Sequence, residues 1–166
     1  MATITLKGNP IHTMGELPAA GSAAPDFQLV QSNLSVLSLD ALKGKKVVLN
    51  IFPSLDTDVC AASVRRFNAQ AAGLDNTVVV CVSKDLPFAH KRFCVAEGIE
   101  NVLTASDFRD GSFGEKYGIT ITDGVLAGLH GRAVVVLNEQ SEVIYNELVP
   151  EIVQEPDYEK AINALS

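Results

Sequence analysis

The residues best suited to chemistry stand at the start of a predicted helix, where Cys60 follows Thr57 by three positions. An apolar run ends at Pro53, and a short polar loop leads from there into the helical pattern. A cysteine in the first turn of a helix meets unpaired backbone N–H groups and the positive end of the helix dipole. Both favour the thiolate, which is the reactive form of the side chain. The Thr57 hydroxyl can donate to the sulfur or to an oxygen bound beside it. The spacing therefore predicts a nucleophilic cysteine.

Two further cysteines, Cys81 and Cys94, bring the total to three. An odd number does not indicate the disulfide framework of a secreted protein, and it leaves redox chemistry, metal binding or burial. Metal binding is disfavoured because the chain has no Cys-x-x-Cys motif. One pair at helical spacing, His90 and Cys94, supplies only two ligands. We therefore expect neither a metal nor another cofactor.

The composition indicates one globular domain spanning residues 1–166, with 47% hydrophobic residues and a formal net charge of −7. So acidic a surface disfavours binding to nucleic acid or to anionic membranes. The N-terminus lacks an apolar segment of signal-peptide length, and no apolar run is long enough to cross a bilayer. We expect a cytoplasmic protein that binds neither nucleic acid nor membrane.

Hydrophobic periodicity divides the chain into strands and helices. Apolar runs predict buried strands at 46–52, 77–83 and 133–138, and alternation predicts an antiparallel partner for the last of these at 142–148. Helical spacing and end signals predict helices at 58–73, 87–97, 112–117 and 157–165. The shorter predicted elements are a hairpin at 3–14 that turns at Gly8-Asn9-Pro10, a loop at 15–25, strands at 27–30 and 102–104, and one helical turn at 39–44.

This order of elements predicts a thioredoxin-like α/β fold, namely a three-layer sandwich with a mixed central sheet and an added N-terminal β-hairpin. In such a fold the loop after the first core strand leads into a helix at the carboxyl edge of the sheet. Open α/β sheets place their ligand sites at that edge. Cys60 therefore falls at the expected site by its position in the fold, independently of its neighbours in the sequence.

The stretch Pro53-Ser-Leu-Asp-Thr57-Asp-Val-Cys60 resembles the Pro-x-x-x-Thr-x-x-Cys signature of the peroxiredoxins. Further segments resemble the bacterial thiol peroxidase subfamily, and together they cover nearly the whole chain. These segments are Gly8-Asn9-Pro10, 50–57, 60–68, Arg92-Phe93-Cys94, 132–136 and 155–158. The Pro/Thr/Cys pattern alone is moderately specific, and the later Cys94 and Arg132 make the resemblance strong.

The resemblance implies a thiol peroxidase that reduces hydrogen peroxide and organic hydroperoxides without a cofactor. It implies that Cys60 is the peroxidatic cysteine and that Cys94 is the resolving cysteine, which forms an intrachain disulfide with it. Thr57 and Arg132 would orient the peroxide and stabilise the thiolate, and Pro53 would shield the sulfur and shape the pocket. The same resemblance implies a homodimer that is reduced by thioredoxin and that favours alkyl hydroperoxides.

Each of these residues also has a plain structural interpretation. Thr57 can cap the helix and Pro53 can end a strand, and both jobs are compatible with the catalytic ones. Arg132 can be a solvated residue at the entrance of a strand. Periodicity alone places Cys94 on the packed side of a helix. The apolar strand around Cys81 favours a packing role for that thiol.

Asp58 and two competing functions remain open. Asp58 places a carboxylate beside a sulfur that should be ionised, which disfavours the thiolate unless the side chain points into solvent. A thiol–disulfide oxidoreductase is the competing enzyme, although Thr57 occupies the place of the first cysteine in its Cys-x-x-Cys motif. A non-catalytic binding module on the same scaffold is the other alternative.

Overall fold

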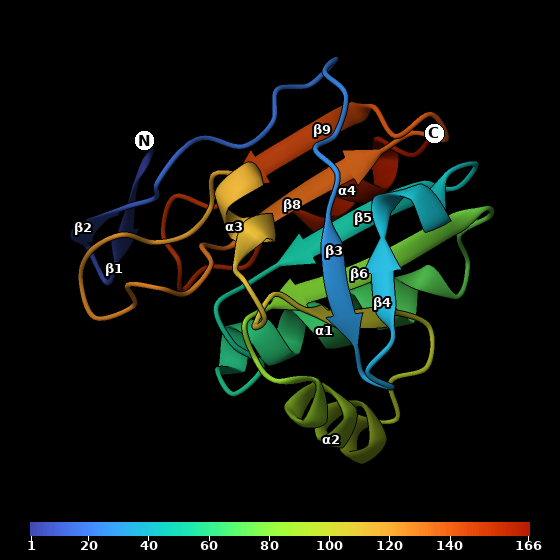
Figure 1. Ribbon diagram of the computed structural model, residues 1–166, viewed down its shortest axis with the longest axis horizontal. Coiled ribbons are helices and arrows are strands. Elements are labelled where there is room, and N and C mark those ends of the chain that lie inside the picture. The colour runs from blue at the N-terminus through green and yellow to red at the C-terminus, as the bar shows by residue number, and fades with distance from the viewer.

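The computed structural model describes residues 1–166 and is built around a seven-stranded mixed sheet with the strand order β4-β3-β7-β6-β5-β8-β9 (Figure 1). The strands are β3 (Gln28–Gln31), β4 (Val36–Ser38), β5 (Lys46–Ile51), β6 (Thr77–Ser83), β7 (Leu103–Ser106), β8 (Ala133–Leu137) and β9 (Val143–Leu148). The helices are α1 (Asp58–Ala71), α2 (Pro87–Glu97), α3 (Ser112–Lys116) and α4 (Tyr158–Asn163), with one 3₁₀ turn at Leu39–Leu42. The predicted sandwich with a mixed sheet is confirmed.

Apolar clusters fill both sides of this sheet, because β5, β6 and β8 carry apolar side chains on both faces. On one side Phe67 of α1, Phe93 of α2 and Tyr158 of α4 pack against the strands. On the other side the stacked rings of Phe113 and Tyr117 fill the space. Figure 1 shows α3 in front of the sheet, with α1 and α4 behind it. None of the helices combines the length and the apolar composition that a bilayer span requires.

The N-terminal hairpin is present, but its predicted turn was wrong. Strands β1 (Thr3–Leu6) and β2 (Asn9–His12) pair with Leu6 opposite Asn9, so the turn consists of Lys7 and Gly8. Both turn residues have positive φ, at 50° and 83°. A two-residue hairpin turn of type I′ needs positive φ at both central positions. Pro10 lies inside β2, where a strand with a free edge tolerates the missing N–H.

Strand β4 had no counterpart among the predicted elements. It is three residues long and pairs only with β3, at the edge of the sheet. So short a segment carries too few alternations to show a period of two, and its pairing is decided by the neighbouring strand. The buried strand at 77–83 and the helix at 87–97 are confirmed without change of bounds, and most other ends shift by one or two residues.

Three strand ends meet at one edge of the sheet and form the foundation of the site. β5 and β6 are parallel, with Ile51 opposite Val82, so both strands end at this edge. β8 runs antiparallel to β5, and its first residue, Ala133, lies opposite Ile51. The loop after β5, the connection after β6 and the chain just before β8 are therefore neighbours, although they are far apart in the sequence.

Candidate active site

Cys60 is the third residue of α1 and is fully buried. The chain leaves β5, crosses a short loop and enters the helix at Asp58, with Thr57 in an extended conformation as the N-cap residue. The sulfur therefore lies at the end of the helix where backbone N–H groups lack intrahelical partners. This placement agrees with the position predicted for a nucleophilic cysteine.

Arg132 brings its guanidinium group to the Cys60 sulfur. Its Nη2 lies 3.3 Å from Cys60 Sγ, and its Nε donates to the carbonyl of Ile152 at 2.8 Å. Only 3% of Arg132 is exposed, and the buried Nη1 has no hydrogen-bond partner in the protein. An arginine keeps its charge at any relevant pH, so a permanent buried cation lies beside the sulfur. Nη1 remains free to donate to an oxygen atom placed next to the sulfur.

Thr57 and Pro53 complete the polar and apolar sides of this corner. The Thr57 hydroxyl donates to the Ser54 carbonyl at 2.9 Å and does not cap the backbone of α1. The capping role considered for Thr57 is therefore wrong, because the hydroxyl turns back into its own loop. Pro53 is buried, and both residues line the same cavity as Arg132.

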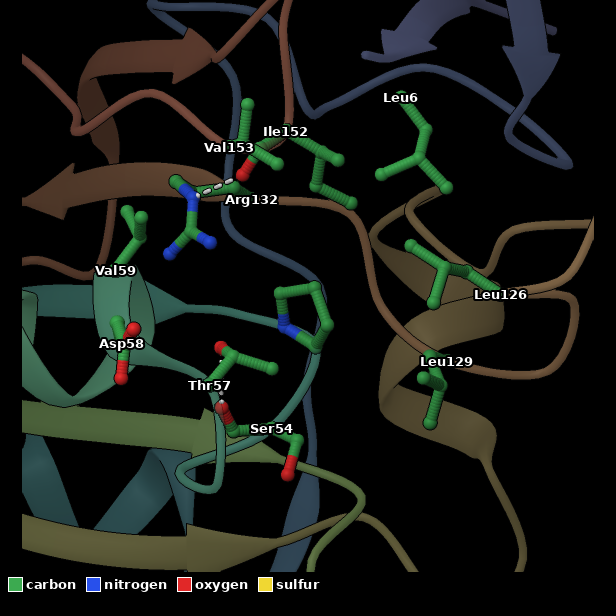
Figure 2. A pocket seen from close by; sticks show the side chains of 11 residues that line it. Leu6, Ser54, Thr57, Asp58, Val59, Leu126, Leu129, Arg132, Ile152 and Val153 are labelled. Carbon is green, nitrogen blue, oxygen red and sulfur yellow. Dashed lines mark hydrogen bonds between the residues drawn. The ribbon is translucent and has the colours of Figure 1, made fainter. Parts of the chain in front are cut away.

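This cavity, of about 310 Å³, opens beside the start of α1. Figure 2 shows Arg132 and Thr57 on one side of the cavity, with leucine side chains from distant segments on the opposite side. Most of the lining is apolar, from the residues Leu6, Pro53, Val59, Leu126, Leu129, Ile152 and Val153. Cys60 does not line the cavity itself, and Arg132 connects the cavity to the sulfur.

The sequence analysis missed these apolar walls. Leu126 and Leu129 lie in a glycine-rich loop. Apolar side chains in a loop that belongs to no strand or helix are the sequence signal that could have identified them. Leu6 belongs to the N-terminal hairpin, and Ile152 and Val153 follow β9. Nothing in their local patterns indicates that these segments meet.

The hairpin also supports Arg132 indirectly. The Glu151 carboxylate accepts hydrogen bonds from the backbone N–H of Gly8 at 2.9 Å and from the hydroxyl of Thr5 at 3.0 Å. These bonds hold the hairpin against the segment whose next residue, Ile152, accepts the Nε–H of Arg132. The hairpin therefore helps to fix the orientation of the guanidinium group.

Asp58 is exposed, lines the cavity and forms no ion pair with Arg132. Solvent screens a carboxylate in such a position. The structure thus resolves the concern raised by its place in the sequence, because the charge of Asp58 faces water and not a buried sulfur.

Cys94 and Cys81 occupy different environments, and no disulfide joins any of the three cysteines. Cys94 is half-buried on α2 and packs against the apolar cluster that contains Cys60. Burial raises the pKa of the Cys94 thiol, and a hydrogen bond with the Thr104 side chain opposes that shift. Cys81 is fully buried in β6, and burial raises its pKa to about 12. Its surroundings agree with the packing role expected for it.

Known proteins that resemble this chain include redoxins and thiol peroxidases, which agrees with a reactive cysteine at the site. A family model described as Redoxin matches residues 19–162. Thiol peroxidases of Mycobacterium tuberculosis and Mycobacterium bovis are 62% identical over 165 residues, which is 99% of this chain and 99% of each relative. A peroxiredoxin-like protein from Aquifex aeolicus superimposes with a TM-score of 0.93 at 40% identity, covering 98% of this chain and 95% of that one.

A more distant structure, the thiol peroxidase from Chromobacterium violaceum, superimposes with a TM-score of 0.87 at 20% identity and covers 97% of this chain and 93% of its own. At that identity the likeness shows the fold alone. The close relatives extend it to the sequence over nearly the full length. The chain therefore belongs to the thiol peroxidase subfamily of the peroxiredoxins, within the redoxin family.

Proposed function

We propose that Cys60 is the peroxidatic cysteine of this thiol peroxidase, with Arg132, Thr57 and Pro53 as its active-site partners. The observation that carries the proposal is the contact of the buried Arg132 Nη2 with Cys60 Sγ at 3.3 Å. The free Nη1 on the same guanidinium group supplies a second donor beside the sulfur. A nucleophile, a cation that stabilises it and a spare donor thus stand together next to a cavity.

The chemistry that this geometry supports is a displacement at a peroxide oxygen. The Cys60 thiolate attacks one oxygen of ROOH, an S–O bond forms and the O–O bond breaks. Cys60 becomes a sulfenic acid, and RO⁻ leaves and takes up a proton to give ROH. Negative charge develops on the leaving oxygen, so donors already in place lower the barrier. Arg132 Nη1 and the N-terminal N–H groups of α1 are suited to that task.

The cavity supports a hydroperoxide with an apolar substituent as well as hydrogen peroxide. A cavity of about 310 Å³ exceeds what hydrogen peroxide needs, and it lies in the range of sites for small organic ligands. Its apolar walls remove the substituent from water, while Arg132 and Thr57 provide a polar side. The –OOH group would lie on that side, next to Arg132.

We propose Cys94 as the resolving cysteine. Its thiol condenses with the Cys60 sulfenic acid, an S–S bond forms and water leaves. Cys94 suits this step better than Cys81, because Cys94 is partly exposed on a helix whereas Cys81 is sealed inside the sheet. The disulfide then returns to two thiols by exchange with a dithiol reductant of the thioredoxin type.

Single substitutions test these roles in a peroxide-consumption assay with a thioredoxin system. Cys60→Ser is expected to abolish turnover, because an alcohol is a far weaker nucleophile than a thiolate. Cys94→Ser is expected to react with one equivalent of peroxide and then stop. Cys81→Ser is the matched control and is expected to turn over like the parent. Substantial turnover by Cys60→Ser would overturn the assignment, and normal cycling by Cys94→Ser would remove Cys94 from the resolving role.

The homodimer and the cytoplasmic location implied by the resemblance stay predictions. Sedimentation velocity of the reduced protein is expected to give twice the chain mass of 17.7 kDa. Cell fractionation is expected to place the protein with cytoplasmic markers. A monomer at micromolar concentration, or recovery outside the cytoplasm, would contradict these two predictions separately.

A further inference from the structure

The Asp85 carboxylate joins the segment that leads to Cys60 and the segment that leads to Cys94. Asp85 lies between the end of β6 and the start of α2, the helix that carries Cys94. Its Oδ1 accepts the hydroxyl of Ser54 at 2.7 Å, and its Oδ2 accepts the backbone N–H of Leu55 at 2.8 Å. Ser54 and Leu55 belong to the loop that leads from β5 into the Cys60 helix. One carboxylate therefore fastens the Cys60 loop to the connection that begins the Cys94 helix.

The same carboxylate is tied to the body of α2 through Ser83. The Ser83 hydroxyl donates to Asp85 Oδ2 at 2.6 Å, and the Ser83 oxygen lies 2.9 Å from Nε2 of His90. Ser83 and His90 are fully buried, and only 11% of the Asp85 side chain is exposed. A hydroxyl that donates to a carboxylate is left to accept, so His90 donates from Nε2. The bonds form one chain from His90, the fourth residue of α2, to the loop before Cys60.

The loop side of this chain reaches the active site. Ser54 contacts Asp85 through its hydroxyl, and its carbonyl accepts the hydroxyl of Thr57. Releasing Ser54 would therefore also release Thr57, which lines the cavity. Two other links between these regions are ion pairs on the surface, Arg92 with Asp56 at 3.2 Å and Arg65 with Glu97 at 2.8 Å. Surface pairs of this kind contribute little, whereas a nearly buried carboxylate that loses its donors is costly.

We propose that Asp85 is a positioning residue of the peroxidase, and that its carboxylate latches the Cys60 loop to the start of the Cys94 helix. The proposal rests on the functions proposed above for Cys60 and Cys94. With the latch closed, Thr57, Cys60 and Arg132 keep the geometry that reacts with peroxide. With the latch open, the loop and α2 separate, and the sulfenic acid can meet the second thiol.

The latch therefore sets the outcome of a competition. The Cys60 sulfenic acid either condenses with the Cys94 thiol and loses water, or reacts with a second ROOH to give sulfinic acid and ROH. A closed latch favours the first oxidation of Cys60 and keeps the sulfenic acid apart from its partner. Weakening the latch should slow the first oxidation and should move the product from sulfinic acid towards the disulfide.

The experiment compares Asp85→Ala and Ser54→Ala with the parent protein. Two quantities are measured: the second-order rate of Cys60 oxidation by cumene hydroperoxide in stopped flow, and the fraction of sulfinic acid by intact mass after a fixed excess of that peroxide. We expect the oxidation rate of Asp85→Ala to fall about 10-fold, which corresponds to the loss of hydrogen bonds to a charged group. We expect its sulfinic fraction to fall as well. Ser54→Ala, which loses only the loop-side hydroxyl, should show both changes to a smaller extent.

Val143→Ala is the control for general loss of stability, because Val143 is a buried residue of β9 on the opposite side of the sheet from α1 and α2. It should leave the partition between disulfide and sulfinic acid unchanged. The latch is overturned if Ser54→Ala does not lower both the oxidation rate and the sulfinic fraction. It is also overturned if Val143→Ala lowers both quantities to the same extent as Ser54→Ala. If Asp85→Ala does not fold, the result for Ser54→Ala decides. A parent protein that fails to oxidise at Cys60 would instead overturn the proposed function, so the two failures are distinguishable.

Discussion

Arg132 is anchored at one side of its guanidinium group and free at the other. Nε holds the Ile152 carbonyl, Nη2 contacts the Cys60 sulfur and Nη1 has no partner in the protein. Arg132→Ala should therefore slow the first oxidation of Cys60 by about 10²–10³-fold, the usual cost of losing one preorganised donor. Arg132→Lys keeps the positive charge but loses the planar guanidinium group with its several N–H donors. Its oxidation rate should therefore lie between those of the parent protein and Arg132→Ala.

Stopped-flow oxidation with circular dichroism as the folding control measures this effect. A folded Arg132→Ala protein with the parent rate would place Arg132 outside the chemistry.

The Cys81 thiol should be inert in the folded protein. Burial raises its pKa to about 12, so almost none of it is thiolate near neutral pH, and no solvent reaches it. Iodoacetamide at pH 8 should label Cys81 only after denaturation. Peptide mapping of the native and the unfolded protein checks this, with Cys94 as the internal comparison. Labelling of Cys81 in the native protein at a rate equal to that of Cys94 would contradict the packing role.

At this scale the sequence predicts the nucleophile better than its surroundings. The Thr57–Cys60 spacing at a helix start follows from local patterns, and the structure places both residues there. Arg132 was a candidate mainly through resemblance, because its contact with Cys60 depends on β8 lying next to β5 in the sheet. The local sequence gives no sign of a role for Asp85. That role depends on contacts at the sheet edge with a loop about thirty residues earlier in the chain.

Among the elements, α2 contains a buried histidine that should make stability depend on pH. Burial lowers the pKa of His90 to about 4, and the nearby Asp85 carboxylate opposes that shift. At a pH below about 6.5, which is the pKa of His90 in the unfolded chain, the unfolded chain binds a proton at His90 and the folded protein does not. The free energy of unfolding should therefore fall as the pH drops from about 6.5 towards 4, with a loss of about 2 kcal/mol between pH 7 and pH 5.

Urea denaturation of the parent protein and of His90→Gln at both pH values separates this effect from other groups. Glutamine keeps a side-chain N–H for Ser83 but does not titrate. An equal loss of stability in both proteins would show that His90 is not its source.

Formation of the Cys60–Cys94 disulfide should require local opening of the two helices. Cys60 is fixed in the first turn of α1, and Cys94 lies within α2. A disulfide needs Cα atoms within about 4.4–6.8 Å of each other, which two packed helices seldom provide. Hydrogen exchange should therefore show less protection at residues 57–64, at 87–97 or at both in the oxidised protein. Equal protection of these segments in the two redox states would contradict this expectation.

The elements that were predicted well are those whose burial fixes their pattern. β6 and α2 have the predicted bounds, because a continuous apolar run and a Pro–Gly pair of end signals leave little choice. The predicted turn at Gly8-Asn9-Pro10 was wrong because the strand register makes Lys7 and Gly8 the turn residues. Lys7 has a positive φ there, which its residue type does not favour, so the local sequence does not indicate it. β4 depends on its partner strand, so local sequence cannot indicate it.

For the whole molecule, the fold explains how four distant segments build one site. The β5–α1 loop and the first turn of α1 supply Thr57 and Cys60, and the chain before β8 supplies Arg132. The hairpin and the segment after β9 close the cavity. The order of elements predicted the sandwich and the edge at which Cys60 lies. It could not predict the cavity, because an antiparallel hairpin added to the N-terminus carries no local sign of where it packs.

The central claim is that Cys60 accepts an oxygen atom from the peroxide as a sulfenic acid, and that Cys94 removes this oxygen as water by forming a disulfide. Intact mass and peptide mapping after one equivalent of cumene hydroperoxide test it most directly. We predict that the reduced chain loses two hydrogens and that the mapped peptides contain a Cys60–Cys94 disulfide, with Cys81 still a free thiol. A disulfide between Cys60 and Cys81, or an unmodified Cys60 after the peroxide has been consumed, would contradict the account.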